Sequence, residues 1–171
     1  MERTIQEGKA GVGTGVDTKT VRGRRELAFG SLDEVVADAE RLVASPHTRT
    51  LGNWPLSQLL THLATAINRS IDGIAFRAPL SVRIIGFFIK GRVMKKGLRP
   101  GFRLPREREA GAYPPAASPQ EALETLRAAV ARTRTERITA RHPVFGRLTH
   151  EEWVRFHLRH AELHLSFAVP G

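Results

Sequence analysis

The chain has 171 residues, of which 41% are hydrophobic and 26% are charged, so its composition is that of one globular domain and not of a disordered protein. It contains no cysteine, which excludes disulfide bonds, thiolate zinc sites and cysteine nucleophiles. The formal net charge is +10, but the window from Arg77 to Arg108 holds ten basic residues and one acid, Glu107, and so carries +9 by itself. The positive charge is therefore a local feature of one segment.

The beginning of the chain is polar and rich in glycine, and we expect residues 1–23 to form a mobile tail ahead of a single domain over 24–171. No apolar run reaches the ~20 residues that a membrane-spanning helix needs. The most apolar run, residues 80–89, is about half that length and contains Arg83. The N-terminus also lacks the apolar core of a signal peptide, so we expect a cytoplasmic protein without a transmembrane segment.

Helix-start patterns recur along the rest of the chain. Three of them place a hydroxyl residue three positions before a glutamate, as in a capping box, ahead of an apolar periodic run: Ser31 with Glu34, Ser118 with Glu121, and Thr149 with Glu152. The apolar periodicity and the glycine and proline positions predict five helices. In chain order these cover about 32–44, 55–72, 80–95, 119–139 and 150–168.

The four long amphipathic helices predict an all-α fold, a four-helix bundle. The helix over 80–95 is an extra short one, and with the Gly- and Pro-rich residues that follow it forms a long crossover between the second and third bundle helices. No alternating run indicates a strand, and no internal repeat is present.

Histidines mark the last predicted helix. At 100° per residue, His157, His160 and His164 all fall on the apolar face that also carries Trp153. Several buried imidazoles on one stripe would repel one another if protonated, and neutral imidazole is a good metal ligand. Residues four apart on a helix have Cβ atoms ~5–6 Å apart, so His160 and His164 can converge on one ion.

His62, in the middle of the second bundle helix, is the expected third ligand. Three histidines leave at least one coordination position open, which is the arrangement of catalytic metal sites. The alternative is that each of these histidines is a core residue with its polar atoms satisfied. We place His157, Trp153 and His142 around the site as pocket or supporting residues. Glu162 faces away from the histidines, and no catalytic acid or base can be named.

The same residues carry a family resemblance. The segments Gly52–Ala64, His142–Trp153 and His157–His164 resemble the DinB/YfiT-like metalloenzyme superfamily, and within it a bacterial branch known as a domain of unknown function (DUF1569-like). The resemblance covers about residues 24–167. It implies a four-helix bundle whose metal is bound by one histidine of the second helix and an i, i+4 pair of the last. Carried over, these are His62, His160 and His164.

The resemblance also implies a class of chemistry. Characterised members of the superfamily include thiol-dependent transferases and isomerases, and dimers are common among them. We therefore expect a metal-dependent hydrolase or thiol transferase that acts on a small molecule, with homodimer formation as a further expectation. The cofactors would be zinc, nickel, iron or manganese, which three imidazoles do not distinguish, and a low-molecular-weight thiol.

The basic window admits two roles. In the first, Arg83, Lys90, Arg92, Lys95 and Lys96 attract an anionic substrate or an acidic thiol; in the second, they only keep an apolar insert in solution. The competing function is a non-enzymatic helical module that binds an anionic surface or nucleic acid. Aromatic residues interleaved with base-reading side chains are missing, so sequence-specific nucleic-acid binding is not expected.

Overall fold

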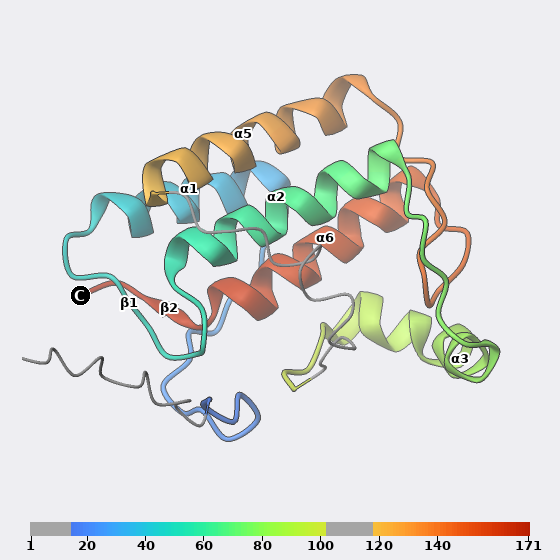
Figure 1. Cartoon of the computed structure of the whole chain (residues 1–171), viewed down its shortest axis with the longest axis horizontal. Coiled ribbons are helices and arrows are strands. Elements are labelled where there is room, and N and C mark those ends of the chain that lie inside the picture. Colours follow the sequence, from blue (N-terminus) through green and yellow to red (C-terminus); the bar gives the residue numbers. More distant parts are fainter. Residues whose placement is uncertain (1–14, 102–117) are drawn as a thin grey trace, which may run out of the picture.

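The computed structural model describes residues 15–101 and 118–171, and within them the chain is mostly helical (Figure 1). These residues form five helices and one two-stranded sheet: α1 (Leu32–Ala44), β1 (Arg49–Thr50), α2 (Leu56–Asp72), α3 (Leu80–Lys96), α5 (Pro119–Thr135), α6 (His150–Leu165) and β2 (Ala168–Val169). The expectation of a predominantly helical fold is confirmed. No helix in the described part of the chain is both long and apolar enough to cross a membrane.

Side-chain caps fix the beginnings of three helices. Complete capping boxes begin α5 and α6. The hydroxyls of Ser118 and Thr149 each accept a hydrogen bond from the glutamate N–H three residues on, and their own backbone N–H groups donate to the carboxylate of that glutamate. At α1 the Ser31 hydroxyl accepts from the Glu34 N–H, while the Glu34 carboxylate accepts from the Gly30 N–H. The predicted starts of these three helices are confirmed.

The ends of two helices differ from the prediction. Helix α5 ends at Thr135 and not near 139, because the chain beyond it runs past the end of α2, where the Ala140 N–H donates to the Ser70 carbonyl. Helix α6 ends at Leu165 and not near 168, because the following residues form β2.

The expectation that the chain has no strand is wrong. Strands β1 and β2 pair antiparallel, with Arg49 opposite Val169 and Thr50 opposite Ala168. Each strand has two residues, which is too short for an alternating pattern to be visible in the sequence. The pair ties the turn before α2 to the end of α6.

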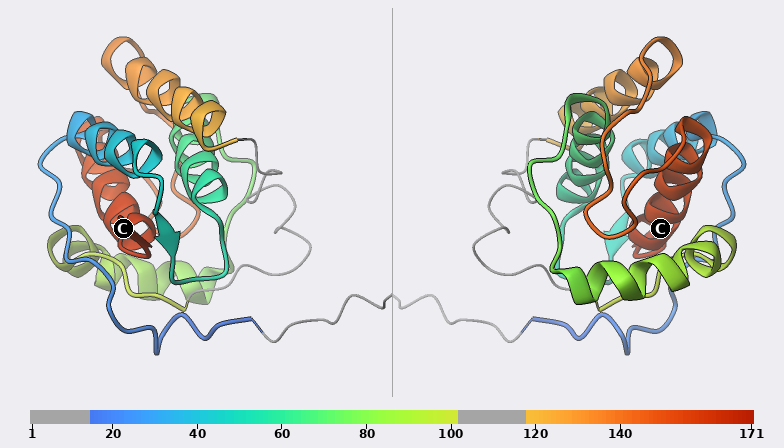
Figure 2. Two further views of the ribbon diagram at one scale, coloured as in Figure 1. Left: turned by 90° about the vertical axis from the view of Figure 1, so that its left-hand side faces the viewer. Right: turned by 90° about the vertical axis from the view of Figure 1, so that its right-hand side faces the viewer.

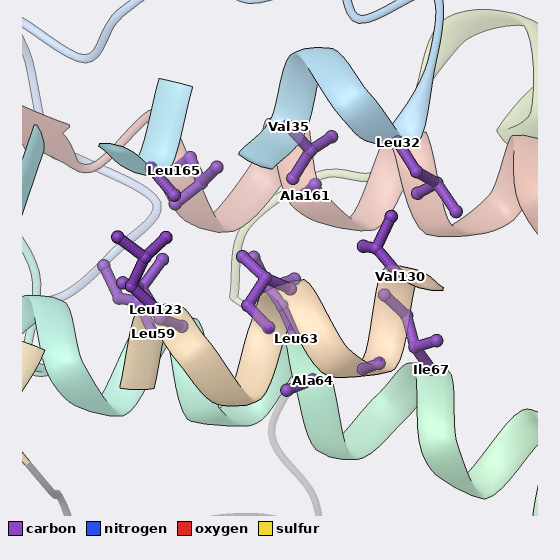
Figure 3. Close-up of a cluster of buried hydrophobic side chains, with 14 of the residues drawn as sticks. Leu32, Val35, Leu59, Leu63, Ala64, Ile67, Leu123, Val130, Ala161 and Leu165 are labelled. Atoms are coloured by element: carbon purple, nitrogen blue, oxygen red, sulfur yellow. The ribbon is translucent and has the colours of Figure 1, made fainter. Parts of the chain in front are cut away.

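The core lies among four helices. Helices α2 and α1 each contact both α5 and α6, so the four surround a common interior (Figure 1). Leucines, alanines and β-branched residues from all four meet there (Figure 3), among them Val35 of α1, Leu63 of α2, Val130 of α5 and Ala161 of α6. Buried apolar faces of this kind supply most of the stability of helices in globular proteins.

Helix α3 lies outside this group of four (Figure 2) and contacts α6. Gly86 lies against Val144, and the Lys90 ammonium is 2.7 Å from a Glu152 carboxylate oxygen. Met94, on the same side of the helix, is buried. The predicted extra helix is therefore present, but with 17 residues it is as long as α2 and α5 and is not a short one. Of the predicted crossover, residues 102–117 lie outside the described residues.

The N-terminal segment is described from residue 15 onward. Residues 15–23 form no helix or strand, and the Asn53 side chain hydrogen-bonds both the N–H and the carbonyl of Val16. Residues 1–14 of the predicted tail lie outside the described residues. The boundary at residue 24 and the mobility of the tail stay predictions.

Candidate metal centre

Three histidines from two helices meet between α2 and α6. His62 lies on α2, and His160 and His164 lie one turn apart on α6. One ring nitrogen from each lies within 4.8 Å of the other two, and the three residues are partly buried. The ring centroids are 5.0, 4.7 and 4.6 Å apart, and the planes of the three pairs are inclined by 77°, 64° and 78°. Sequence analysis predicted this histidine trio, and the structure brings its three members together.

The nitrogen separations fit a shared ion. The Nε2 atoms of His62 and His160 are 3.1 Å apart. Two nitrogens bound to one tetrahedral zinc ion at 2.0–2.1 Å would be about 3.3 Å apart. In the described part of the chain, the buried Nδ1 of His160 has no hydrogen-bond partner. In the ring of His160, Nε2 therefore faces another imidazole and Nδ1 has no protein partner. A metal ion bound to Nε2 would give that nitrogen a ligand bond.

Electrostatics keep the rings in the form that binds metals. Burial lowers the pKa of His160 well below its ordinary value, and the neighbouring His164 and His62 lower it further. Burial likewise lowers the pKa of His164, with added repulsion from His62 and Arg24. Imidazole coordinates a metal only when neutral, so these rings are ready to do so at neutral pH without first losing a proton.

Aromatic side chains form walls around the trio. The Trp54 ring stacks on His164, with centroids 5.4 Å apart and planes 5° from parallel, and its centroid is 5.1 Å from that of His62. On another side Phe156 stacks on His160 with a centroid distance of 5.7 Å. Sequence analysis did not assign Trp54 to the site. An aromatic residue just before the helix that carries His62 was the available signal.

His157 is buried beside the trio without joining it. The Ser70 hydroxyl donates to the Ile67 carbonyl, so the contact of 2.9 Å between its oxygen and Nε2 of His157 is a hydrogen bond donated by the histidine. Burial, with a contribution from His142, lowers the pKa of His157 to about 3. The ring is thus a neutral core group that links α6 to the end of α2.

Trp153 and His142 support the same end of α6. Trp153 stacks on His157 at 5.4 Å and donates its indole N–H to the Ala140 carbonyl. Nδ1 of His142 accepts hydrogen bonds from the backbone N–H groups of Val144 and Phe145. Both residues therefore shape the connection that enters α6. Among the described residues, neither is one of the three histidines that could share a metal ion.

Glu162 and the basic residues of α3 lie apart from the trio. The Glu162 carboxylate accepts from the Phe29 N–H and pairs with Arg159, so it faces away from the trio as expected. The five basic residues predicted to attract anions, Arg83, Lys90, Arg92, Lys95 and Lys96, all lie on α3. Helix α3 contacts α6, and Lys90 is neutralised by Glu152. The structure gives no contact between these cations and the trio in its described part.

Surface hollows lie elsewhere on the protein. One of about 480 Å³ is lined by the connection from α5 to α6, including Ile138 and Leu148. A second of about 380 Å³ lies between α3 and the face of α6 that carries Leu158. Neither is lined by a histidine of the trio.

Comparison with known proteins places the chain in a family. Residues 21–171 match the profile of a family described as "Protein of unknown function (DUF1569)". No curated protein and no solved structure matches the chain significantly.

Proposed function

We propose that this chain, which belongs to the DUF1569 family, binds a divalent transition metal through His62, His160 and His164 and uses it in catalysis on a small molecule. The observation that carries the proposal is the convergence of three imidazole nitrogens from two helices, each within 4.8 Å of the others. The rings meet edge to face, and the Nε2 atoms of His62 and His160 lie 3.1 Å apart, so one ion could serve ring nitrogens that the fold has already brought together.

We infer that α1, α2, α5 and α6 form a four-helix bundle of the DinB/YfiT-like type, with α3 added to it. In support, each of α1 and α2 contacts both α5 and α6. One candidate ligand lies on the second of these helices and an i, i+4 pair lies on the last, which is the distribution that the resemblance implies.

The chemistry follows from the ligand set. A bound metal would act as a Lewis acid and lower the pKa of a water or small thiol in its open coordination position. The three imidazoles are neutral ligands, so they would leave the positive charge of the cation uncompensated and available to a thiolate or hydroxide. Trp54 and Phe156 flank the trio with apolar rings, which exclude water from two of its sides.

Two reaction classes fit this arrangement: hydrolysis by an activated water and transfer of an activated thiol to an electrophilic substrate. Among the described residues, the group that could hold a metal consists of three histidines and contains no carboxylate that would serve as a general base. The nucleophile would then be activated by the cation alone. A screen of the metal-loaded protein with low-molecular-weight thiols and electrophiles, with and without thiol, distinguishes the two classes.

Cobalt(II) titration tests metal binding. Cobalt(II) bound to nitrogen ligands has visible absorption bands that report its coordination geometry. We expect the metal-free protein to bind one equivalent with a saturable spectrum typical of four or five ligands, and His160→Ala to abolish it. The matched control is His47→Ala, which removes an exposed histidine on the turn between α1 and β1. Absence of a saturable spectrum, or an unchanged spectrum in His160→Ala, would refute the proposal.

A further inference from the structure

Helix α3 exposes a large apolar surface. Its outward-facing side chains include Phe87 and Phe88, which are 73% and 78% exposed, and Leu80, Ile84 and Ile85, each more than half exposed. The patch as a whole comprises Leu80, Val82, Ile84, Ile85, Phe87, Phe88 and Ile89, and these are seven of the eight large exposed hydrophobic residues in the described part of the chain. Contiguous apolar surface of this kind on an otherwise polar protein marks a binding surface.

The charged residues beside this patch are all positive. Residues 77–101 contain seven lysines and arginines and no acidic residue. Lys90 pairs with Glu152, whereas Arg92, Lys95 and Lys96 form no ion pair with any residue that the structure describes. Helix geometry places the three unpaired cations on the outward side, one to two turns beyond Phe88. The apolar residues and the cations therefore follow one another along the same outward face.

The helix is fixed in this orientation. Gly86, Val93 and Met94 are on the inward side, and the contact of Gly86 with Val144 together with the ion pair of Lys90 holds that side against α6 and its entry loop. Figure 2 shows α3 running across the outside of the other helices. Its outer side therefore faces away from the other four helices.

We propose that α3 binds the surface of an anionic phospholipid membrane. The apolar residues would enter the boundary between headgroups and acyl chains, and Arg92, Lys95 and Lys96 would contact lipid phosphates. Side chains that protrude from an outward-facing helix fit a deformable lipid surface, whereas a protein partner would need a matching apolar groove. Binding of this kind leaves the helix in the plane of the interface, and no helix in the described part of the chain is both long and apolar enough to cross a membrane.

A second copy of this chain fits the same surface less well. Parallel packing of two α3 helices would place like-charged lysines side by side. Antiparallel packing would bring Lys95 and Lys96 next to the N-terminus of the partner helix, which carries the positive end of the helix dipole. Both arrangements add repulsion that an anionic lipid surface does not.

Vesicle flotation tests the proposal with the full chain. We expect the wild type to float with vesicles of equal parts phosphatidylglycerol and phosphatidylcholine and to remain unbound with phosphatidylcholine alone. The triple variant Arg92→Gln/Lys95→Gln/Lys96→Gln should bind roughly 100-fold more weakly, because each cation near an anionic surface contributes about a factor of five. The double variant Phe87→Ser/Phe88→Ser should lose at least about tenfold through its lost apolar contact.

The matched control removes the same charge elsewhere. Arg49→Gln/Arg134→Gln/Arg137→Gln alters exposed arginines on β1 and at the end of α5, which has no extensive contact with α3, and should bind as the wild type does. An equal loss in this control would show that net charge and not α3 drives binding, and would overturn the proposal. Failure of the wild type to float with anionic vesicles would overturn it as well.

The absence of cysteine permits a direct readout of depth. A polarity-sensitive fluorophore on Phe88→Cys should shift to the blue on anionic vesicles, while the same label on Ala131→Cys, an exposed position of α5, should not. A shift at both positions would contradict docking through α3. A dimer in solution that Phe87→Ser/Phe88→Ser converts to a monomer would assign the surface to a second copy and also overturn the proposal.

Discussion

The histidines on and near α6 and α2 differ in their hydrogen-bond partners, and these partners decide their chemistry. His142 accepts two backbone hydrogen bonds, His157 donates to Ser70, and the trio rings face one another. Helical spacing predicted the pair His160 and His164, because positions four apart lie on one face of a helix, and the place of His62 on the second helix made it the expected third ligand. The same spacing did not separate His157 from the ligands, since the deciding contact comes from α2.

Acid should destabilise the metal-free protein. Burial lowers the pKa of His142 to about 4 and, together with repulsion from His142, that of His157 to about 3, against an ordinary value near 6.5. Below about pH 6.5 the unfolded chain binds protons that the folded chain refuses, so stability is full above this pH and falls as the pH drops towards 3–4. Each such histidine contributes up to about 1.4 kcal/mol per pH unit to the loss.

Urea unfolding at about pH 7.5 and about pH 5 measures this loss. Replacement of His157 by Gln keeps a hydrogen-bonding group near Ser70 and removes the titration, and should reduce the difference between the two pH values by about 2 kcal/mol. His47→Ala should leave the difference unchanged. A pH dependence in His157→Gln equal to that of the wild type would show that His157 is protonated in the folded protein.

At the scale of elements, the sequence predicts where helices begin better than where they end. The starts of α1, α5 and α6 are fixed by local capping residues, which are visible in the sequence. The ends of α5 and α6 are set by contacts with distant segments, the end of α2 in one case and β1 in the other. Trp54 reaches the trio through the same kind of long-range packing, which explains why the sequence did not assign it.

Helix α3 depends on one glycine for its contact with the rest of the protein. A Cβ at Gly86 would clash with the Val144 side chain and lie 2.8 Å from its carbonyl oxygen. Gly86→Ala should therefore loosen α3 and speed hydrogen exchange of its amides, although alanine favours a helix by about 1 kcal/mol. Gly91→Ala is the matched control, because a Cβ there meets nothing within 4 Å and should stabilise the helix. Faster exchange in both variants would contradict this packing.

At the scale of the whole molecule, one buried ion pair joins three segments. Both carboxylate oxygens of Asp38 on α1 accept hydrogen bonds from Arg25, at 2.8 and 2.6 Å, and the same guanidinium donates to the Leu165 carbonyl at the end of α6. Burial by itself would raise the pKa of Asp38, but the hydrogen bonds from Arg25 and Arg41 hold it below its ordinary value. The pair thus connects the segment before α1 with both α1 and α6.

Loss of this pair should destabilise the whole fold. Asp38 is 2% exposed, and Asp38→Ala leaves the Arg25 guanidinium partly buried without its carboxylate, at a cost of about 3–5 kcal/mol. Asp33→Ala removes an exposed partner of Arg134 and should cost less than about 1 kcal/mol. Urea unfolding of both variants measures the difference. Equal small effects would show that the buried pair does not contribute to stability.

The metal content of the purified protein tests the central claim most directly. The chain would be produced without a histidine tag and analysed for transition metals by elemental mass spectrometry, beside His62→Ala, His160→Ala and His47→Ala. We predict about one metal ion per chain in the wild type and in His47→Ala, and a loss of most of it in the two trio variants. A wild-type protein that stays free of metal after incubation with zinc, nickel, iron and manganese, or trio variants that retain it fully, would contradict the claim.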